Sequence, residues 1–415
     1  MINKNLTLLL FIAILITSVF QLYFIHLFGS YFSIVFILII LLIPSLFTSL
    51  KFYEIKIIFY IILLISITLL SLIWSVDIKI GLKNALWYLF FVILFFTAFK
   101  LTTVRPSQVL LSMKIYFLFL LIPIILIIVF RLNPNIEASF IYGSVSKLFI
   151  NPNIIAQINN DILTNISDPN KAGGFFVNAN VAGTYLGVNY FILIGLFIAY
   201  RNRYYLIMSL ITSIGIVFAG SKASILIFLL LNISLLLRKQ WKKIFFLLPI
   251  VIISIIIIHR LLPLESFNNE ILKTMNIRIL IWSFAVENFI SHPIIGLGFG
   301  EWMQRFEEYA DSNAIHMFPP HNTIIALWSD SGIIAAILGL LIIYCTLKYG
   351  IALQKIRNKQ LNGLGVAVFF SFSWVFLQGM GENFGLLGDE HMKVILAIIL
   401  GYSYAYYVKF LRSQV

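Results

Sequence analysis

Long apolar runs recur along the whole chain, and each is bounded by charged residues, proline, glycine or asparagine. A run of about 20 apolar residues is long enough to cross the hydrocarbon core of a bilayer as one helix. We therefore expect an all-α polytopic membrane protein with about 12 membrane-spanning helices. The expected spans are approximately Leu6–Phe28, Tyr31–Leu50, Ile57–Trp74, Asn84–Phe99, Ile115–Phe130, Asn180–Tyr200, Tyr204–Ala219, Ala223–Leu237, Ile244–Ile258, Asn322–Leu347, Leu361–Gln378 and Met392–Phe410.

Two long polar stretches interrupt this pattern, at residues 131–179 and 259–320. An even number of spans puts both termini on one side of the membrane and both long loops on the other. We expect the whole chain, residues 1–415, to form a single transmembrane domain. The N-terminal run lacks a small-residue cleavage site, so we interpret it as the first span rather than as a signal peptide.

Composition supports the membrane assignment, since hydrophobic residues make up 61% of the chain and charged residues only 11%. Soluble domains carry about 25% charged residues. The chain has one cysteine, Cys345, which excludes a disulfide within the chain and a cysteine-based metal site.

The charge distribution sets the expected orientation. With the N-terminus inside, the inner loops and tails hold 18 of the 29 Lys and Arg residues but only one of the 16 acidic residues, Glu54. A basic excess on short inner loops is the positive-inside pattern. The net charge of +13 therefore indicates contact with anionic membrane lipids, not with nucleic acid.

Candidate chemistry gathers on the outer side. In the second long loop, Arg278, Trp282, Ala285 and Phe289 recur at helical spacing. They predict a short helix on the membrane surface, ended by Pro293 and the glycines that follow it. A snorkelling arginine on an interfacial helix explains the same pattern without any chemistry.

The loop ends at His321-Asn322, behind two prolines that block helix continuation upstream. Asp330 follows nine residues later, in the outer half of the next span. An ionisable residue at that depth is a functional candidate by default. The simpler alternatives are a histidine that starts a helix at the lipid interface and an aspartate that is satisfied by packing.

Two further outer segments carry charge. Lys222 lies in the tight turn between two spans, where it either contacts a lipid headgroup loosely or points into an outer cavity. Glu382 lies in a glycine-rich loop before Asp389, Glu390 and His391. The spacing of these acids and this histidine fits no metal motif, so we expect no metal site.

Lys222, Arg278 and His321 form the candidate constellation. Two fixed cations and one titratable imidazole suit a diphosphate ligand and a proton that must be moved. Because ATP is scarce outside the cytoplasmic membrane, a diphosphate there belongs most plausibly to a lipid carrier.

Four stretches in order resemble the O-antigen ligase and polymerase superfamily of bacterial inner-membrane glycosyltransferases. The turn arginine of that family is Lys222 here, and its glutamate after the histidine is Asp330. The matching stretches are Gly174–Gly183 ("G-x-F-x-N-x-N-x-x-A/G"), Gly220–Ser224 ("S-R-A-S"), Arg278 with Trp282 and Pro293–Gly298 ("R…W…P-x-x-G-x-G"), and His321-Asn322 with Asp330 and Gly332 ("H-N…E-x-G").

The resemblance implies a fold like that of GT-C glycosyltransferases and a metal-independent reaction without a cofactor. The donor would be a glycan on undecaprenyl diphosphate, and the active site would face the periplasm from the inner membrane. Lys222 and Arg278 would bind the diphosphate and His321 would be the general base. Asn322, Asp330, Asn180 and Glu382 would support them.

Three functions stay open at this point. A ligase transfers the glycan to the sugar hydroxyl of lipid A-core, and this function is favoured because the histidine motif is well kept. A polymerase uses another lipid-linked glycan as the acceptor. A flippase for the same lipid would carry charged residues along a path through the spans, whereas the charges here cluster outside.

Overall fold

The computed structural model describes residues 4–20, 22–27, 30–46, 55–152, 154–155, 168, 170–237, 264–309, 319–382 and 384–414. The expected ninth span, Ile244–Ile258, lies outside these residues, so the count of twelve spans stays a prediction. The described part is almost entirely helical, which confirms the all-α fold class.

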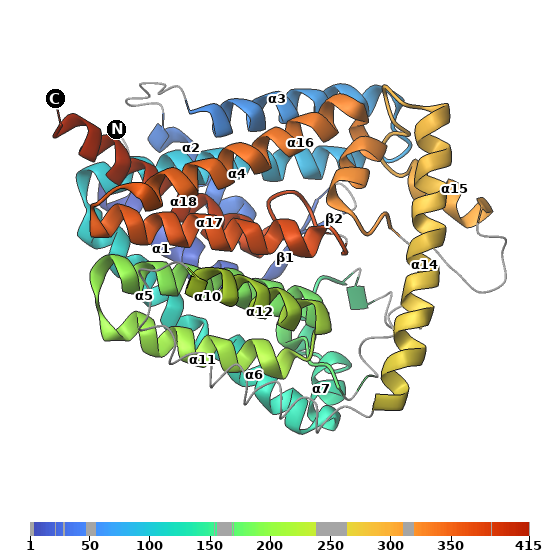
Figure 1. Ribbon diagram of the computed structural model, residues 1–415, viewed down its shortest axis with the longest axis horizontal. Helices are drawn as coiled ribbons and strands as arrows, with labels where there is room; N and C mark the ends of the chain where they lie inside the picture. The colour runs from blue at the N-terminus through green and yellow to red at the C-terminus, as the bar shows by residue number, and fades with distance from the viewer. Residues whose placement is uncertain are drawn as a thin grey trace.

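Helices run side by side along the length of the molecule, and both termini lie at one end of this bundle (Figure 1). The first half contains α1 (Lys4–Phe20), β1 (Tyr23–Leu27), β2 (Ser30–Ser33), α2 (Ile34–Leu46), α3 (Lys56–Ser71), η1 (Leu72–Trp74), α4 (Ile78–Val104), α5 (Pro106–Phe119), α6 (Leu121–Leu132), α7 (Pro134–Ile141), α8 (Ser146–Phe149) and η3 (Gly174–Phe176). The second half contains α10 (Ala179–Tyr200), α11 (Arg203–Ala219), α12 (Lys222–Leu237), α14 (Leu264–Ser291), α15 (Glu301–Tyr309), α16 (Thr323–Lys355), α17 (Lys359–Gly379) and α18 (Glu390–Arg412).

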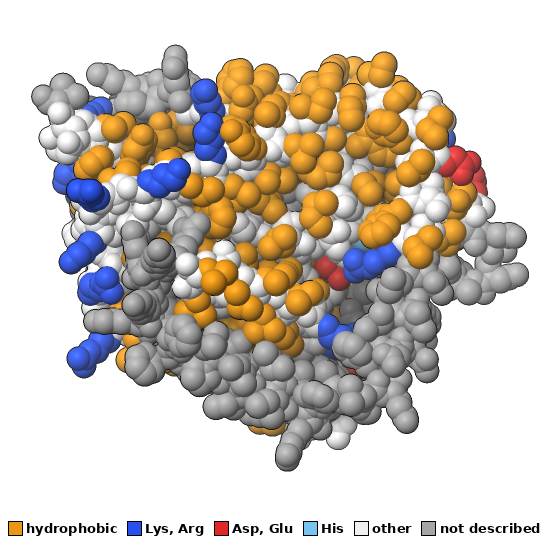
Figure 2. Space-filling view, in the orientation of Figure 1, with side chains coloured by type: hydrophobic (Ala, Val, Ile, Leu, Met, Phe, Trp, Pro, Cys, Tyr) orange, Lys and Arg blue, Asp and Glu red, His pale blue; other side chains and the backbone are white. Residues whose placement is uncertain are grey.

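Among the described residues, seven helical stretches are long and apolar enough to cross a membrane. They are α3 with η1, α4, α5 with α6, α10, α16, α17 and α18; the shorter apolar helices are α1, α2, α11 and α12. Hydrophobic side chains cover the middle of the bundle, and Lys and Arg side chains gather at the end that carries the termini (Figure 2). The chain is therefore a multi-pass membrane protein, as its hydropathy predicts.

The first two expected spans differ from the structure. The helix α1 ends at Phe20, and the strand β1 that follows pairs antiparallel with β2. The residues of β1 are aromatic or branched as well as apolar, so hydropathy alone does not distinguish a continued helix from a strand hairpin. A second difference is the break between α5 and α6 at Leu120, three residues before Pro123, whose missing N–H interrupts the helical hydrogen-bond pattern.

The centre of the bundle is the contact between α10 and α17. Eighteen of the 22 residues of α10 are buried. A Cβ atom on Gly195 would lie 2.6 Å from the carbonyl oxygen of Gly363, and one on Gly363 would lie 2.5 Å from that of Gly195. Glycine at both positions lets the two backbones touch, which is the close packing that small residues permit between membrane helices. This contact sets the relative positions of two segments that carry site residues.

The helix α14 has 28 residues, whereas the sequence predicts only a short interfacial helix around Arg278. It crosses the end of the bundle opposite the termini, roughly perpendicular to the bundle helices (Figure 1). The predicted length is therefore wrong, and the location of this helix at the membrane surface stays a prediction.

Candidate active site

Glu382, in the loop between α17 and α18, is the residue on which the site converges. Its Oε1 accepts a hydrogen bond from Asn180 Nδ2 at 2.9 Å and lies 3.6 Å from Arg278 Nη2. Its Oε2 lies 3.9 Å from His321 Nδ1. The side chains of Glu382, His321 and Arg278 are 17%, 23% and 28% exposed. The cluster is therefore largely buried but still in contact with solvent.

The loop of Glu382 is fastened to the start of α16. Thr323 Oγ1 lies 3.1 Å from the carbonyl oxygen of Gly379 and 2.7 Å from that of Phe384, and its hydroxyl donates to these acceptors. A Cβ atom on Gly381 would lie 2.8 Å from Arg278 Nη1. Glycine at this position therefore lets the guanidinium lie against the loop backbone, next to the carboxylate.

Asn178 and Asn180 lie in the stretch Gly174–Gly183, and their side chains have different roles. Asn178 caps α10, because its side chain accepts from the backbone N–H of Asn180 at 2.8 Å. Asn180 points its amide at two partners: its Nδ2 donates to Glu382, and its Oδ1 accepts from Ser221 Oγ at 2.6 Å. Asn180 is thus the link between the α11–α12 turn and the α17–α18 loop.

Lys222 begins α12 and directly follows Ser221. The turn before it depends on Gly220, whose φ of 73° is in the left-handed region that favours glycine. Ser221 Oγ also accepts from the backbone N–H of Ser224 at 3.2 Å, which fixes the first turn of α12. The structure therefore places Lys222 one residue from a hydrogen-bonded chain that runs through Asn180 to Glu382.

His321 and Asn322 have separate roles at the start of α16. Asn322 is the N-cap, since its Oδ1 accepts from the N–H groups of Ile324 and Ile325 at 2.9 and 3.1 Å. His321, one residue earlier, has a φ of 46°, which is unusual for a residue other than glycine, and such strain gathers at functional sites. The cap and the strained residue together direct the imidazole towards Glu382.

The electrostatics of the cluster favour a neutral imidazole. Burial, and then the nearby Arg278 cation, lower the pKa of His321 to about 4. Burial also raises the pKa of Glu382, although Arg278, the Asn180 amide and Lys171 oppose that shift. At neutral pH, His321 is accordingly a proton acceptor, which is the state that a general base requires.

Lys171 is a neighbour of Glu382 that the sequence did not single out. It lies at the end of the first long loop and forms an ion pair with Asp168 at 3.1 Å. The loop is joined to the α11–α12 turn, because Ala172 N donates to the carbonyl oxygen of Ala219 at 3.1 Å. The signal available in the sequence was its position, three residues before the Gly174–Gly183 stretch.

Asp330 lies apart from this cluster. It is near Tyr88 of α4, and no hydrogen bond or ion pair within the described part of the chain joins it to His321, Arg278 or Glu382. Two residues further on, Gly332 breaks α16 with a φ of 85°. Asp330 is therefore placed beside a helix break rather than beside the imidazole.

The segment Pro293–Gly298 provides hydrogen-bond partners for the backbone at that helix break. The N–H groups of Leu297 and Gly298 donate to the carbonyl oxygen of Ser329 at 2.7 and 2.9 Å, and Ile333 N donates to the carbonyl oxygen of Ile294 at 2.9 Å. A broken helix at membrane depth needs such partners for its freed backbone groups. The glycines that the sequence suggested as helix terminators thus also dock the second loop onto α16.

Glu382 does not form a cluster with Asp389, Glu390 and His391, the other charged residues of this outer segment. His391 is buried and its Nδ1 donates to the carbonyl oxygen of Ser18 at 2.8 Å. Asp389 caps α18, and Glu390 forms an ion pair with Lys83 at 2.7 Å. These three residues have local partners of their own, because α18 begins at Glu390 and turns their side chains away from the loop of Glu382.

Comparison with known proteins gives two partial matches. Residues 206–340 match a family described as "O-Antigen ligase", and this range contains Lys222, Arg278 and His321. This part of the chain is therefore similar to the O-antigen ligase family. It is also 26% identical over 191 residues to a Rickettsia conorii protein named "Putative polysaccharide ligase".

That alignment covers 41% of this chain and 45% of the Rickettsia protein, so the chain matches less than half the length of this relative. Asn180 and Glu382 lie outside the range that matches the O-antigen ligase family. Their place in the candidate site rests on the contacts of Glu382 with Asn180, Arg278 and His321.

Proposed function

We propose that the protein is a membrane glycosyltransferase of the O-antigen ligase type. It transfers O-antigen or a related surface polysaccharide from undecaprenyl diphosphate to a sugar hydroxyl of lipid A-core, on the periplasmic side of the inner membrane. The observation that carries this proposal is the convergence of Arg278, His321 and the Ser221-Lys222 turn on Glu382.

In the proposed reaction, the acceptor hydroxyl oxygen attacks the anomeric carbon of the lipid-linked sugar. A new carbon–oxygen bond forms while the bond between the anomeric carbon and the diphosphate breaks, and the bonding electron pair leaves with the diphosphate. Arg278 and Lys222 stabilise the negative charge that develops on this leaving group. Stabilisation of the leaving group needs no metal here, because the two side chains supply the positive charge.

His321 takes the proton of the acceptor hydroxyl. Its imidazole is neutral at pH 7 and can accept this proton, and the carboxylate of Glu382, with Oε2 3.9 Å from Nδ1, stabilises the resulting imidazolium. Glu382 acts through His321 and is a positioning residue. Since it also pairs with Arg278, the incoming diphosphate competes with it for the guanidinium.

The test in cells is the lipopolysaccharide banding pattern of a deletion strain. Loss of all O-antigen from the core indicates a ligase, and retention of a single repeat unit indicates a polymerase. The wild-type gene should restore the ladder and His321→Ala should not, although the variant is present in the membrane. His292→Ala, which changes another histidine of the same loop, is the matched control and should restore it.

A further inference from the structure

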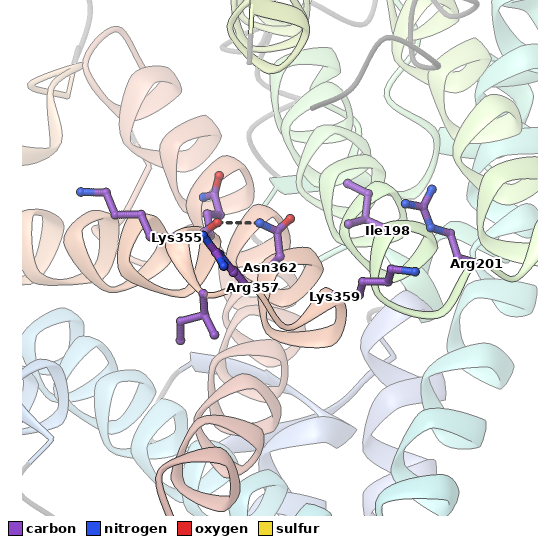
Figure 3. A pocket seen from close by; sticks show the side chains of 8 residues that line it. Ile198, Arg201, Lys355, Arg357, Lys359 and Asn362 are labelled. Atoms are coloured by element: carbon purple, nitrogen blue, oxygen red, sulfur yellow. Dashed lines mark hydrogen bonds between the residues drawn. The ribbon is translucent and has the colours of Figure 1, made fainter. Parts of the chain in front are cut away.

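A second polar feature lies at the other end of the bundle, the end that carries the termini. A cavity of about 420 Å³ opens between the C-terminus of α10 and the α16–α17 connection (Figure 3). Four of the residues that line it are cations: Arg201, Lys355, Arg357 and Lys359. We call this set the inner cation ring.

Two tight connections position the inner cation ring. Arg201 ends α10 in the left-handed conformation, with a φ of 54°, and its N–H donates to the carbonyl oxygen of Phe197 at 2.8 Å. Asn202 caps α11 and Asn358 caps α17. The side chains of Arg201, Lys355, Arg357 and Lys359 are exposed, yet the backbone that carries them is held by helix ends and caps.

No ion pair of the described residues involves a member of the inner cation ring, whereas Arg278 at the outer end has Glu382. The described acidic residues lie on the outer segments, and the charged side chains visible near the termini are Lys and Arg (Figure 2). Four cations around one cavity repel each other, so an anion that enters from outside the protein lowers the energy of this arrangement.

The side chain of Gln354 fixes the backbone beside the cavity. Its amide donates from Nε2 to the carbonyl oxygens of Gly350 in α16 and Gly365 in α17, at 3.1 and 3.0 Å. These two hydrogen bonds join the end of α16 to α17, so the cations of the α16–α17 connection are carried on a fixed backbone.

The adjoining surface of α16 is apolar. Leu340, Tyr344 and Ile351 are 52%, 57% and 36% exposed. Their spacing continues at Lys355, so all four share one face of the helix. Acyl chains of a lipid whose phosphate lies at Lys355 would run along this face towards the membrane centre. This continuity favours a lipid headgroup over a free phosphate ion.

We propose that this cavity binds the headgroup of an anionic phospholipid of the inner leaflet. The phosphate contacts the inner cation ring. Phosphatidylglycerol has the required negative charge. The bound lipid joins α10 to the α16–α17 connection.

The experiment measures the thermal unfolding of the full-length protein in a neutral detergent with added phosphatidylglycerol, phosphatidylcholine or inorganic phosphate. Phosphatidylglycerol should raise the unfolding temperature in a saturable manner, and phosphatidylcholine should raise it less. In Arg201→Gln/Lys359→Gln, the apparent affinity for phosphatidylglycerol should fall about 25-fold, since each cation near a membrane surface contributes about one kcal/mol.

The matched control is Lys409→Gln/Arg412→Gln, which removes two cations from the last turn of α18 at the same end of the bundle. It should keep the wild-type affinity. Equal losses in the two double variants would overturn the proposal, because they would show a general charge effect. A phosphate-induced shift as large as that of phosphatidylglycerol would overturn the lipid assignment and indicate a free-anion site.

A second measurement covers the case in which the cavity variant is unstable. Native mass spectrometry counts the phosphatidylglycerol molecules retained by each folded protein, independent of its unfolding temperature. The single variant Lys355→Gln should retain less lipid than Lys409→Gln. Equal retention by the two single variants would contradict a binding site in the cavity.

Discussion

The two ends of the helical bundle differ in whether an acidic side chain balances their cations. At the outer end, Arg278, His321 and Asn180 surround the carboxylate of Glu382, so the protein supplies both signs of charge. At the inner end, the inner cation ring surrounds a cavity without an acidic partner among the described residues. Under the two proposals above, the outer end binds an anion that leaves after the reaction, and the inner end binds an anion that stays.

The difference follows from the carboxylate of Glu382, which has no counterpart among the described residues at the inner end. A protein anion next to Arg278 keeps the guanidinium oriented while the donor is absent, at the expense of competition when the diphosphate binds. No such competitor is present at the inner cation ring. The comparison predicts turnover at the outer site and long residence at the inner one, and the variants below test its outer half.

The largest effect is expected for His321→Ala. Loss of a general base costs about 10²- to 10⁴-fold in rate. The rate of glycan transfer should fall by that factor in proteoliposomes, while the amount of folded protein is unchanged. His292→Ala should retain a rate close to that of the wild type, and a His321→Ala rate within about twofold of the wild type would exclude the base role.

Arg278→Ala should lower kcat/KM by about 100-fold, because it removes a charge-assisted contact to the diphosphate and leaves Glu382 buried without its cation. Arg278→Lys keeps the charge but not the planar guanidinium, so its loss should be about tenfold. The control Arg305→Ala breaks an ion pair with Glu301 on α15 and should change kcat/KM little. Equal losses for the alanine and lysine variants would argue against a diphosphate contact.

Glu382→Gln sharpens the distinction between binding and catalysis. The glutamine can still accept from Asn180, but the negative charge beside Arg278 and His321 is gone. The donor KM should fall or stay unchanged because a competing anion is lost, and kcat should fall about tenfold because the imidazolium is less stabilised. Glu287→Gln, an exposed position on α14, is the control. A higher donor KM with unchanged kcat would contradict the competition.

The pH dependence should separate the free from the donor-bound enzyme. The pKa of His321 is about 4 in the donor-free protein, so at pH 6 nearly all of its imidazole is neutral and kcat/KM loses little from this group. A bound diphosphate favours the imidazolium and raises this pKa, so kcat should fall with acid at a higher pH than kcat/KM does. A His321-dependent fall of kcat/KM near pH 6.5 would contradict the shielded geometry.

The smallest effect is expected for EDTA. Since Lys222 and Arg278 are assigned the charge stabilisation, chelation of divalent cations should change the initial rate of transfer by less than about twofold. Proteoliposomes with and without EDTA, prepared from the same protein, provide the measurement. Strong inhibition that added Mg²⁺ or Mn²⁺ reverses would point to a metal in the reaction.

Much of the bundle could be predicted from hydropathy. The bounds of α10, α11, α12 and α17 agree with the expected spans to within two residues. Hydropathy measures transfer into lipid, so it did not show the strand pair before α2 or the break at Gly332. Both depend on backbone partners, and the break is stabilised by Pro293–Gly298, a segment distant in sequence.

The candidate site was predictable only in part. Lys222, Arg278 and His321 could be chosen because their residue types and outer location suit a diphosphate and a proton. The central position of Glu382 could not, since its hydrogen-bond partner Asn180 is 202 residues away. No spacing rule covers such a distance, and the nearby His391 suggested a grouping that the fold does not form. Asp330 was assigned to the site by its position in the sequence alone, and the fold places it near Tyr88 of α4 instead.

The most direct test of the central claim is the stoichiometry of the reaction at the outer end. Purified protein in proteoliposomes is given an undecaprenyl-diphosphate-linked glycan and a lipid A-core acceptor, and released undecaprenyl diphosphate and transferred glycan are measured together. The wild-type protein should release one undecaprenyl diphosphate for each glycan transferred, and His321→Ala should do neither. Equal transfer by His321→Ala, or transfer without release of the diphosphate, would contradict the assignment of this site.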